Sequence, residues 1–231
     1  MDYNNIRLET LSVDQLIDLA MRKDTPSEVL TKLGEDVYLR SMVAINTKVS
    51  PELLNQWAED ERKEVRISVA YNPSTPIEAL NKLAEDEYWK VRKAVANNVS
   101  TPPELLSRLA DDKDWEVRFS VVQNPRVHSE TLLKLMSDEV EYVRYAAIRS
   151  SNTPFEALDK SVQYELAFDG NTRPELLAKL AESNEPMVRL GVAAHSNTTP
   201  EVLTKLKEDE NIFVSFVATE RLEYSEEQKK I

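Results

Sequence analysis

The chain has 231 residues, a net charge of −12, 41% hydrophobic and 30% charged residues, 3 Gly, 11 Pro and no Cys. This composition is typical of a soluble chain with a sizeable core, and no apolar run approaches the ~20 residues of a membrane span. The lack of Cys excludes disulfides, thiol catalysis and Cys-ligated zinc or iron–sulfur sites. It fits a cytoplasmic protein, and residues 1–10 lack the apolar segment of a secretory signal.

A repeat begins after residues 1–12, which we expect to form an N-terminal cap. One pattern then recurs from about Val13 to about Ala218, and it can be written V-R-x-x-V-A-x-N…T-P-x-E-L-L-x-x-L-A-x-D. Five successive copies open at one constant spacing, with Leu39, Val65, Val91, Val117 and Val143. Such a period predicts a solenoid, in which each repeat is stabilised by stacking on its neighbours.

Each repeat is expected to hold two short helices. The apolar residues of both segments recur at helical spacing, and no stretch alternates as a strand would. The second segment opens with a motif that resembles a capping box with Pro at the first helical position, as in Thr25…Glu28, Thr75…Glu78, Thr101…Glu104 and Thr153…Glu156. We therefore predict that Thr caps the second helix. We also expect a column of Asn to end the first helix in the left-handed conformation, at Asn46, Asn72, Asn98 and Asn124.

The period is broken once, because Val162 follows Val143 well before a full repeat is complete. The break predicts a short irregular unit around residues 158–170. It is either a change of curvature that shapes a binding site or a neutral deletion in a tolerant loop. The pattern is lost again at residues 220–231, which we expect to form a C-terminal cap and tail. The whole of residues 1–231 is then a single repeat domain.

The 26-residue unit, as it stands at residues 65–86, resembles the leucine-rich repeat variant. This resemblance implies an all-α, right-handed superhelix of about eight two-helix repeats, with α-helices alternating with short or 3₁₀ helices. The founding type of the family carries an iron–sulfur domain bound by cysteines. This chain has no Cys, so we expect no cofactor. The unit also resembles HEAT-like repeats, the architecture of some DNA glycosylases and of bilin lyases.

Two charged columns follow the repeat. Basic side chains stand at Arg40, Arg66, Arg92, Arg118, Arg144 and Arg189, and acidic ones at Asp36, Asp60, Asp86, Asp112, Asp138 and Asp209. Stacked Arg could bind phosphates, but the joint recurrence favours Arg–Asp pairs along the stack. Basic and acidic residues number 4 and 8 in residues 1–38, 14 and 18 in 39–142, and 11 and 15 in 143–231, so each segment carries −4. No segment has the basic character of a nucleic-acid binder.

Catalytic and metal-binding motifs are missing from the sequence. His128 and His195 each stand alone and are interpreted as loop residues rather than ligands or bases. The chain has no Gly-rich phosphate loop, no G-x-S-x-G and no H-E-x-x-H. We therefore predict no enzymatic activity, no catalytic residues and no metal.

Aromatic residues depart from the repeat in two columns. One column holds Trp89 and Trp115, and the other holds Phe119, Tyr145 and Tyr164. The second position should point away from the core, with neighbouring rings about 10 Å apart. These rings either form one interface patch or seal the seams between repeats.

The function predicted from these features is a scaffold that binds a protein or peptide along one face, anchored by Trp89, Trp115, Phe119, Tyr145 and Tyr164. One alternative is a HEAT-like nucleic-acid-binding protein or a DNA glycosylase-type enzyme that uses Asp114 and Trp115. Another is an acidic decoy that binds a DNA-binding protein.

Overall fold

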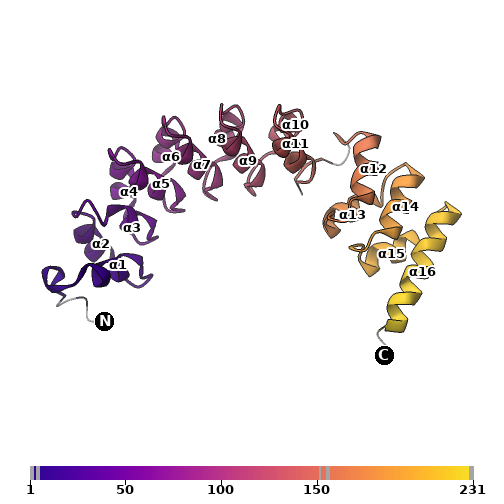
Figure 1. Cartoon of the computed structure of the whole chain (residues 1–231), viewed down its shortest axis with the longest axis horizontal. Coiled ribbons are helices and arrows are strands. Elements are labelled where there is room, and N and C mark those ends of the chain that lie inside the picture. Colours follow the sequence, from indigo (N-terminus) through magenta and orange to yellow (C-terminus); the bar gives the residue numbers. More distant parts are fainter. Residues whose placement is uncertain (1–2, 4–5, 151, 155–156, 229–231) are drawn as a thin grey trace. The chain divides into compact units, whose positions relative to one another are not determined.

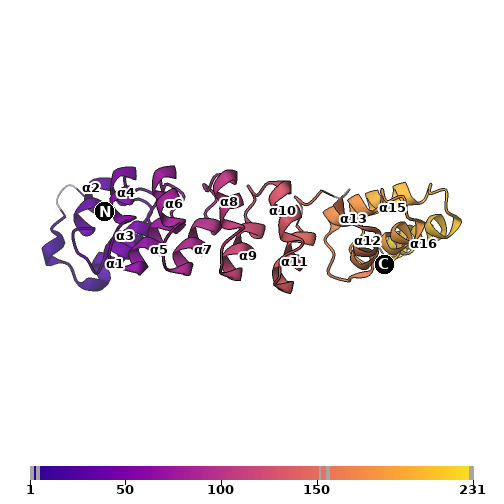
Figure 2. The same cartoon turned by 90° about the horizontal axis from the view of Figure 1, so that it is seen from above.

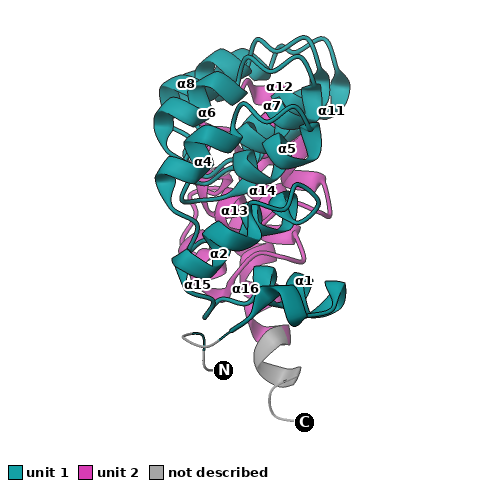
Figure 3. Ribbon diagram, turned by 90° about the vertical axis from the view of Figure 1, so that its left-hand side faces the viewer, with its two compact units in different colours: residues 1–146 teal, residues 147–231 magenta. Residues whose placement is uncertain are grey.

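The computed structural model describes residues 3, 6–150, 152–154 and 157–228. The regular structure in these residues is helical throughout, without a strand, which confirms the predicted α-solenoid. The chain falls into two compact units, Met1–Ala146 and Ala147–Ile231 (Figure 3). The boundary lies close to the break in the repeat period.

Two kinds of helix alternate along the chain. The first helices of the repeats are α1 (Val13–Met21), α3 (Arg40–Ile45), α5 (Lys63–Tyr71), α7 (Trp89–Asn97), α9 (Trp115–Gln123), α11 (Glu141–Ile148), α12 (Lys160–Phe168), α14 (Pro186–Ala194) and α16 (Ile212–Gln228). The second helices are α2 (Ser27–Leu33), α4 (Pro51–Trp57), α6 (Ile77–Leu83), α8 (Pro103–Leu109), α10 (Ser129–Leu135), α13 (Pro174–Leu180) and α15 (Pro200–Leu206). A 3₁₀ turn, η2 (Leu8–Thr10), precedes α1.

Within each unit the helices form two rows. In residues 1–146 the first helices α3, α5, α7 and α9 pack side by side, and the second helices form the other row (Figures 1 and 2). In residues 147–231 the first helices α12, α14 and α16 pack in the same succession. Within each unit these first helices are therefore neighbours of one another in successive repeats.

The core lies between the two rows. In α5 the side chains of Val65, Val69 and Ala70 are fully buried, and in α6 Leu80 and Leu83 are buried too. Burial of each Val or Leu contributes roughly 1.5–3 kcal/mol. Helices as short as these are marginal in isolation, so this packing between repeats stabilises them.

The second helices are short α-helices, where the family resemblance also allowed 3₁₀ helices. In α6 the N–H of Leu80 donates to Pro76 O at 3.0 Å, which is the α-helical spacing. Bonds of the 3₁₀ type follow the helix, from Glu85 N–H to Lys82 O at 3.1 Å. The tighter turn is thus confined to the C-terminal end, where carbonyls have no α-helical partner.

The Thr of each T-P-x-E motif does not cap the second helix, and this prediction was wrong. The hydroxyl of Thr75 donates instead to the carbonyl of Val69, near the end of α5. Pro76 occupies the N-cap position of α6 without a side-chain bond, which leaves Thr75 one residue too early to reach the helix. The same bond to a carbonyl six residues earlier is made by Thr25, Thr101, Thr153, Thr172 and Thr198. Glu156 of the last box lies outside the described residues.

The Asn column does not adopt the left-handed conformation, which is a second correction. Asn98 has φ −71° and ψ 124°, and its Nδ2 reaches back to the previous repeat. It donates to Ala70 O at 2.7 Å and to Asn72 O at 2.9 Å, while its Oδ1 accepts from Ser100 N–H at 2.8 Å. Asn46, Asn72 and Asn124 repeat these bonds. We call these four residues the Asn ladder.

His195 takes the place of Asn in the second unit. It is buried, its Nε2 lies 2.8 Å from Asp169 O, and its Nδ1 accepts from Asn197 N–H at 3.0 Å. Arg221, in the following repeat, donates to His195 O at 2.9 Å. His195 is therefore a structural residue inside the stack rather than a residue of an open loop, whereas His128 is exposed.

The break in the period removes a second helix. No α-helix is formed by the described residues between α11 and α12, whereas a second helix separates the first helices elsewhere. The helix α12 itself is regular, and Asp159 caps it by accepting from Val162 N–H at 2.9 Å. At the other end, α16 continues through residues 220–228, which we expected to be cap and tail.

Candidate protein-binding surface

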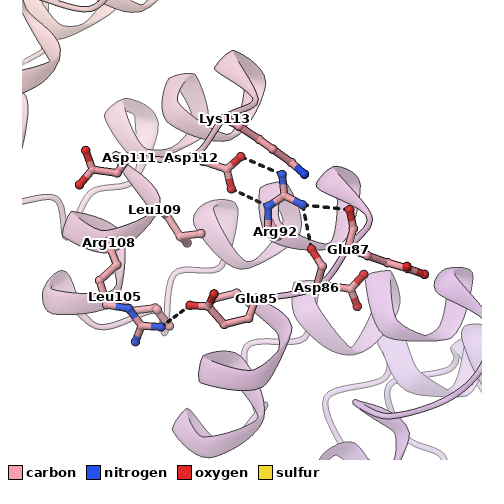
Figure 4. Close-up of a pocket in the computed structure, with 11 residues that line it drawn as sticks. Glu85, Asp86, Glu87, Arg92, Leu105, Arg108, Leu109, Asp111, Asp112 and Lys113 are labelled. Carbon is pink, nitrogen blue, oxygen red and sulfur yellow. Dashed lines mark hydrogen bonds and ion pairs between the residues drawn. The ribbon is translucent and has the colours of Figure 1, made fainter.

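The Arg and Asp columns pair along the stack, as predicted. Arg92 donates from Nε and Nη2 to the carboxylate of Asp112 at 2.5 and 2.8 Å (Figure 4). Its Nη1 donates to the carbonyls of Asp86 and Glu87 at 2.8 and 3.1 Å. This guanidinium is almost fully buried, so the pair fastens one repeat to the next.

The same ion pair, always with the same separation in sequence, recurs at Arg40–Asp60, Arg66–Asp86, Arg118–Asp138 and Arg189–Asp209. Hydrogen bonds from Arg189 lower the pKa of Asp209 below its ordinary value. Burial alone would raise the pKa of Asp138, but hydrogen bonds from Arg118 and from the N–H of Val140 lower it. The charged forms are thus favoured in the folded chain.

A pocket beside Arg92 has a volume of about 350 Å³ and more acidic than basic side chains in its wall (Figure 4). The acids are Glu85, Asp86, Glu87, Asp111 and Asp112, and the bases are Arg92, Arg108 and Lys113. Arg92 is bonded to Asp112, and Arg108 lies 2.5 Å from Glu85. Both Arg side chains of this pocket are therefore already paired with carboxylates of the chain.

Arg144 is the exception in the Arg column. Its Nη1 donates to Asp138 O at 2.6 Å and to Glu139 O at 3.1 Å, as in the other repeats. Within residues 6–146 no carboxylate forms an ion pair with it. In the next repeat Ala157 stands five places before Val162, whereas Asp138 and Asp209 stand five places before Val143 and Val214. In the second unit Gln163 replaces the Arg, and its Oε1 accepts from the hydroxyl of Ser183 at 2.7 Å.

An aromatic cluster lies on the first-helix row of the first unit. We define it as Trp115 and Phe119 of α9 with Tyr142 of α11. The ring centroids of Trp115 and Phe119 are 6.4 Å apart and nearly perpendicular, and those of Trp115 and Tyr142 are 6.2 Å apart. Trp115 is 41% exposed and Tyr142 is 72% exposed. Trp115 and Tyr142 are thus in contact while both remain exposed, and Phe119 beside them is half-buried.

Trp89 lies among lysines on the neighbouring helix α7. The ammonium groups of Lys90 and Lys93 lie 5.4 and 5.6 Å from its ring centroid. Lys93 also forms an ion pair with Glu116 of α9 at 2.6 Å. Trp89 stacks on Tyr88, and its ring makes no contact with Trp115 in the described part of the chain. The two Trp of one column are therefore placed in different surroundings.

Tyr145 and Tyr164 are both close to half exposed. Tyr145 belongs to the first unit, whereas Tyr164 belongs to the second and stacks on Phe168 at 4.7 Å. The sequence singled out both as members of one patch with Phe119. That patch stays a prediction, since the structure gives a ring cluster around Trp115 in one unit and a ring pair in the other.

Sequence reasoning missed several exposed apolar residues. Tyr142 completes the aromatic cluster but follows Glu141, which interrupts the Trp column. In the second unit Ile212, Phe213 and Phe216 are exposed on α16. Phe216 stands two places after Val214, in the column of Phe119 and Tyr145, so extending that column along the chain would have found it.

Trp57 shows that not every Trp of the chain is a surface residue. It is buried at the end of α4. A Cβ added to Gly34 would meet its ring at 2.4 Å. A ring that packs between repeats, such as that of Trp57, is thus buried, whereas the rings of Trp115 and Tyr142 are exposed.

The described residues contain no group of three or more His, Asp or Glu placed to hold a metal ion. Among them, every helix is too short or too polar to cross a membrane.

Comparisons with known proteins agree with the repeat pattern. The sequence model of the family "Leucine rich repeat variant" matches residues 89–114, one complete repeat. A solved structure described as a leucine-rich repeat variant with a novel repetitive protein structural motif is 27% identical, with 85% of this chain and 82% of that chain covered and a TM-score of 0.50.

Other solved repeat proteins are less similar to this chain. A designed armadillo repeat protein for modular peptide recognition is 17% identical over 91% of both chains, with a TM-score of 0.20. An engineered protein is 17% identical over 90% of this chain and 82% of that one, with a TM-score of 0.34. No curated protein matches. The family match over one repeat and the likeness to the solved variant, together with the helical repeats of both units, support the resemblance of this chain to leucine-rich repeat variant proteins.

Proposed function

We propose that the chain is a non-enzymatic scaffold that binds a peptide or protein segment on the first-helix row of residues 1–146. The observation that carries this proposal is the aromatic cluster of Trp115, Phe119 and Tyr142, of which Trp115 and Tyr142 are exposed. Stacking of the repeats does not require these rings, because α5 fills the same columns with Lys63 and Ile67. Exposed aromatic side chains are typical anchors of protein interfaces.

The second-helix row has a different character. It presents exposed ion pairs between successive repeats, at Lys82–Glu59, Arg108–Glu85 and Lys134–Asp111. Such pairs are hydrated and contribute little to stability or to anchoring a partner. The contrast favours the first-helix row as the binding face, with Trp89, Tyr145 and Tyr164 as further candidate contacts.

A random-peptide display library selected on the full chain tests the proposal. We expect the selected peptides to lose most of their affinity for Tyr142→Ala and Trp115→Ala, since truncation of an anchor costs about 2 kcal/mol or more. Tyr38→Ala is the matched control, because Tyr38 is 84% exposed outside the cluster. Unchanged binding to both cluster variants would overturn the proposal. So would a fall of several kcal/mol in the unfolding free energy of Tyr142→Ala, since that ring would then be part of the core.

A further inference from the structure

Two lysines on the first-helix row of residues 1–146 converge on one aromatic ring. The ammonium group of Lys63, in α5, lies 4.8 Å from the ring centroid of Tyr88, and that of Lys90, in α7, lies 6.0 Å from the same centroid. Lys90 also lies 5.4 Å from the ring centroid of Trp89. Both lysines are exposed, and neither forms an ion pair with a carboxylate in the part of the chain that the structure describes. We call Lys63 and Lys90 the lysine pair.

The lysine pair occupies the same positions of the repeat as the aromatic cluster. Lys63 is the first residue of its helix, as Trp89 and Trp115 are of theirs in the next two repeats. Lys90 is the second residue of α7, as Tyr142 is of α11. Because first helices of one unit pack in succession, equivalent positions lie on one face of the row. The lysine pair and the aromatic cluster therefore belong to a single surface of residues 1–146.

Side-chain contacts also connect the two features. Lys93 lies 5.6 Å from the ring centroid of Trp89 and forms an ion pair at 2.6 Å with Glu116 of α9. Glu116 adjoins Trp115, whose ring contacts that of Tyr142. Packed helices lie about 10 Å apart, and an extended peptide advances about 3.3 Å per residue. Two peptide side chains about three to six residues apart can thus reach the lysine pair and the cluster together.

We propose that this surface binds an acidic peptide segment, with an Asp or Glu side chain on the lysine pair and a bulky apolar side chain on Trp115 and Tyr142. The inference rests on the proposed function and adds the chemistry of the partner. A carboxylate near both ammonium groups is complementary to them in charge and offsets their mutual repulsion. Because aromatic rings already hold the two ammonium groups, the lysines lose less side-chain freedom when they bind it.

Lysines beside aromatic rings are also typical of proteins that bind single-stranded nucleic acid. The surroundings of Lys63 favour the peptide, because Glu61, Glu64 and Glu87 line the same pocket, which has a volume of about 510 Å³. A nucleic-acid strand that follows the row would bring its phosphates against these carboxylates. A peptide has to place only one carboxylate beside the lysines, so it avoids most of this repulsion.

The test uses peptides selected on the full chain by display and then synthesised in matched forms, in which each Asp or Glu is replaced in turn by Asn or Gln. We expect one replacement to weaken binding to the wild-type chain about tenfold or more, as loss of a charge-assisted bond does. The double variant Lys63→Gln, Lys90→Gln should weaken the acidic form by a similar factor and bind the amide form as well as wild type does.

The matched control is the double variant Lys82→Gln, Lys134→Gln. It removes the same two charges from exposed positions of the second-helix row and should leave the affinity unchanged. Peptides that need Trp115 and Tyr142 but ignore both the carboxylate and the lysine pair would overturn this inference and leave the proposed function standing. So would an oligothymidylate that binds the wild-type chain and no longer binds when the lysine pair is replaced. A selection that yields no peptide dependent on the aromatic cluster would overturn both.

Discussion

At the scale of single residues, buried polar side chains join one repeat to the next. An Asn amide has two N–H donors and one carbonyl acceptor, and each member of the Asn ladder uses them on three backbone groups. Buried backbone groups need such partners, since an unpaired one costs free energy. The column is therefore occupied by Asn for its hydrogen bonds, and not for the backbone conformation that we expected.

The first prediction concerns Asn98, which is 2% exposed. Asn98→Ala leaves the carbonyls of Ala70 and Asn72 and the N–H of Ser100 without their partner. We expect the free energy of unfolding to fall by about 3 kcal/mol, measured by urea denaturation. Asn81→Ala is the control, because Asn81 bonds Ile77 O at the surface of α6 and should cost far less. Equal costs for the two variants would contradict the structural role of the ladder.

The second prediction concerns the pH dependence of His195. Burial lowers the pKa of His195, and the charge of Arg221 lowers it further. The folded state thus prefers neutral imidazole, so its stabilising contribution is complete above the unfolded pKa of ~6.5 and is lost as pH falls through the folded pKa. Protonation would also put a hydrogen on Nδ1, which accepts from Asn197.

Unfolding of the wild-type chain should therefore need less urea at pH 5 than at pH 7.5. His195→Asn, which restores the residue of the ladder, should remove much of this difference. His128→Asn should leave it unchanged, because His128 is exposed. A wild-type urea midpoint that is equal at the two pH values would argue against this account.

At the scale of helices, the stack is held by close approach and by ion pairs that join consecutive repeats. Arg189 and Asp209 are 10% and 7% exposed and are bonded through two contacts of 2.7 and 3.0 Å. The lowered pKa of Asp209 means that the pair stabilises the fold above the unfolded pKa of ~3.9, and that this stabilisation is lost as pH falls through the folded pKa.

The third prediction follows for Asp209→Asn. At pH 7 it leaves Arg189 buried without a counter-charge, and we expect a loss of about 3 kcal/mol in unfolding free energy. Below pH ~4 wild-type Asp209 is itself increasingly protonated, so the two chains should converge. Glu208→Gln removes the same charge from an exposed position and should have little effect at either pH. A deficit of Asp209→Asn that stays constant down to pH 2 would contradict the ion-pair explanation.

The fourth prediction concerns the contact between α12 and α14. A Cβ on Gly191 would lie 2.8 Å from the Cβ of Ala167 and 2.7 Å from the ring of Phe168. Gly191→Ala should therefore destabilise the chain by about 1–3 kcal/mol through overpacking, despite the better helix propensity of Ala. Gly170→Ala is the control, because its Cβ would meet nothing within 4 Å. Calorimetric melting of the two variants separates them, and equal melting temperatures would refute the steric argument.

At the scale of the whole molecule, the repeat period predicted the class of fold, the succession of helices and the pairing of Arg with Asp. These features depend on apolar spacing and charge columns, which a single sequence displays. The hydrogen bonds of Thr75 and Asn98 could not be assigned correctly, because their partners lie in another helix or another repeat. The aromatic cluster was found in part, through Trp115 and Phe119. Tyr142 was not identified from the sequence, because only the folded chain brings its ring next to that of Trp115.

The fifth prediction concerns the two compact units. Because stability in a repeat protein is a sum of local and nearest-neighbour contributions, Asn98→Ala should raise hydrogen exchange in residues 1–146 and much less in residues 147–231. Asp209→Asn should show the opposite distribution. Mass spectrometry of the exchanged peptides measures both, and uniform protection loss across the chain would show that it unfolds as one cooperative body.

The Asn ladder has a consequence for how such a chain can change in length. Each Asn of the ladder uses its side-chain amide to bond backbone groups of its own repeat and of the preceding one. These bonds do not depend on which side chains stand at the surface positions of either repeat. An extra copy of a whole repeat would therefore offer the same Asn donors to the repeat before it and the same backbone carbonyls to the repeat after it. Duplication within residues 39–124 would extend the rows without new compatibility mutations, whereas the surface positions of each copy would be free to diverge toward a different ligand.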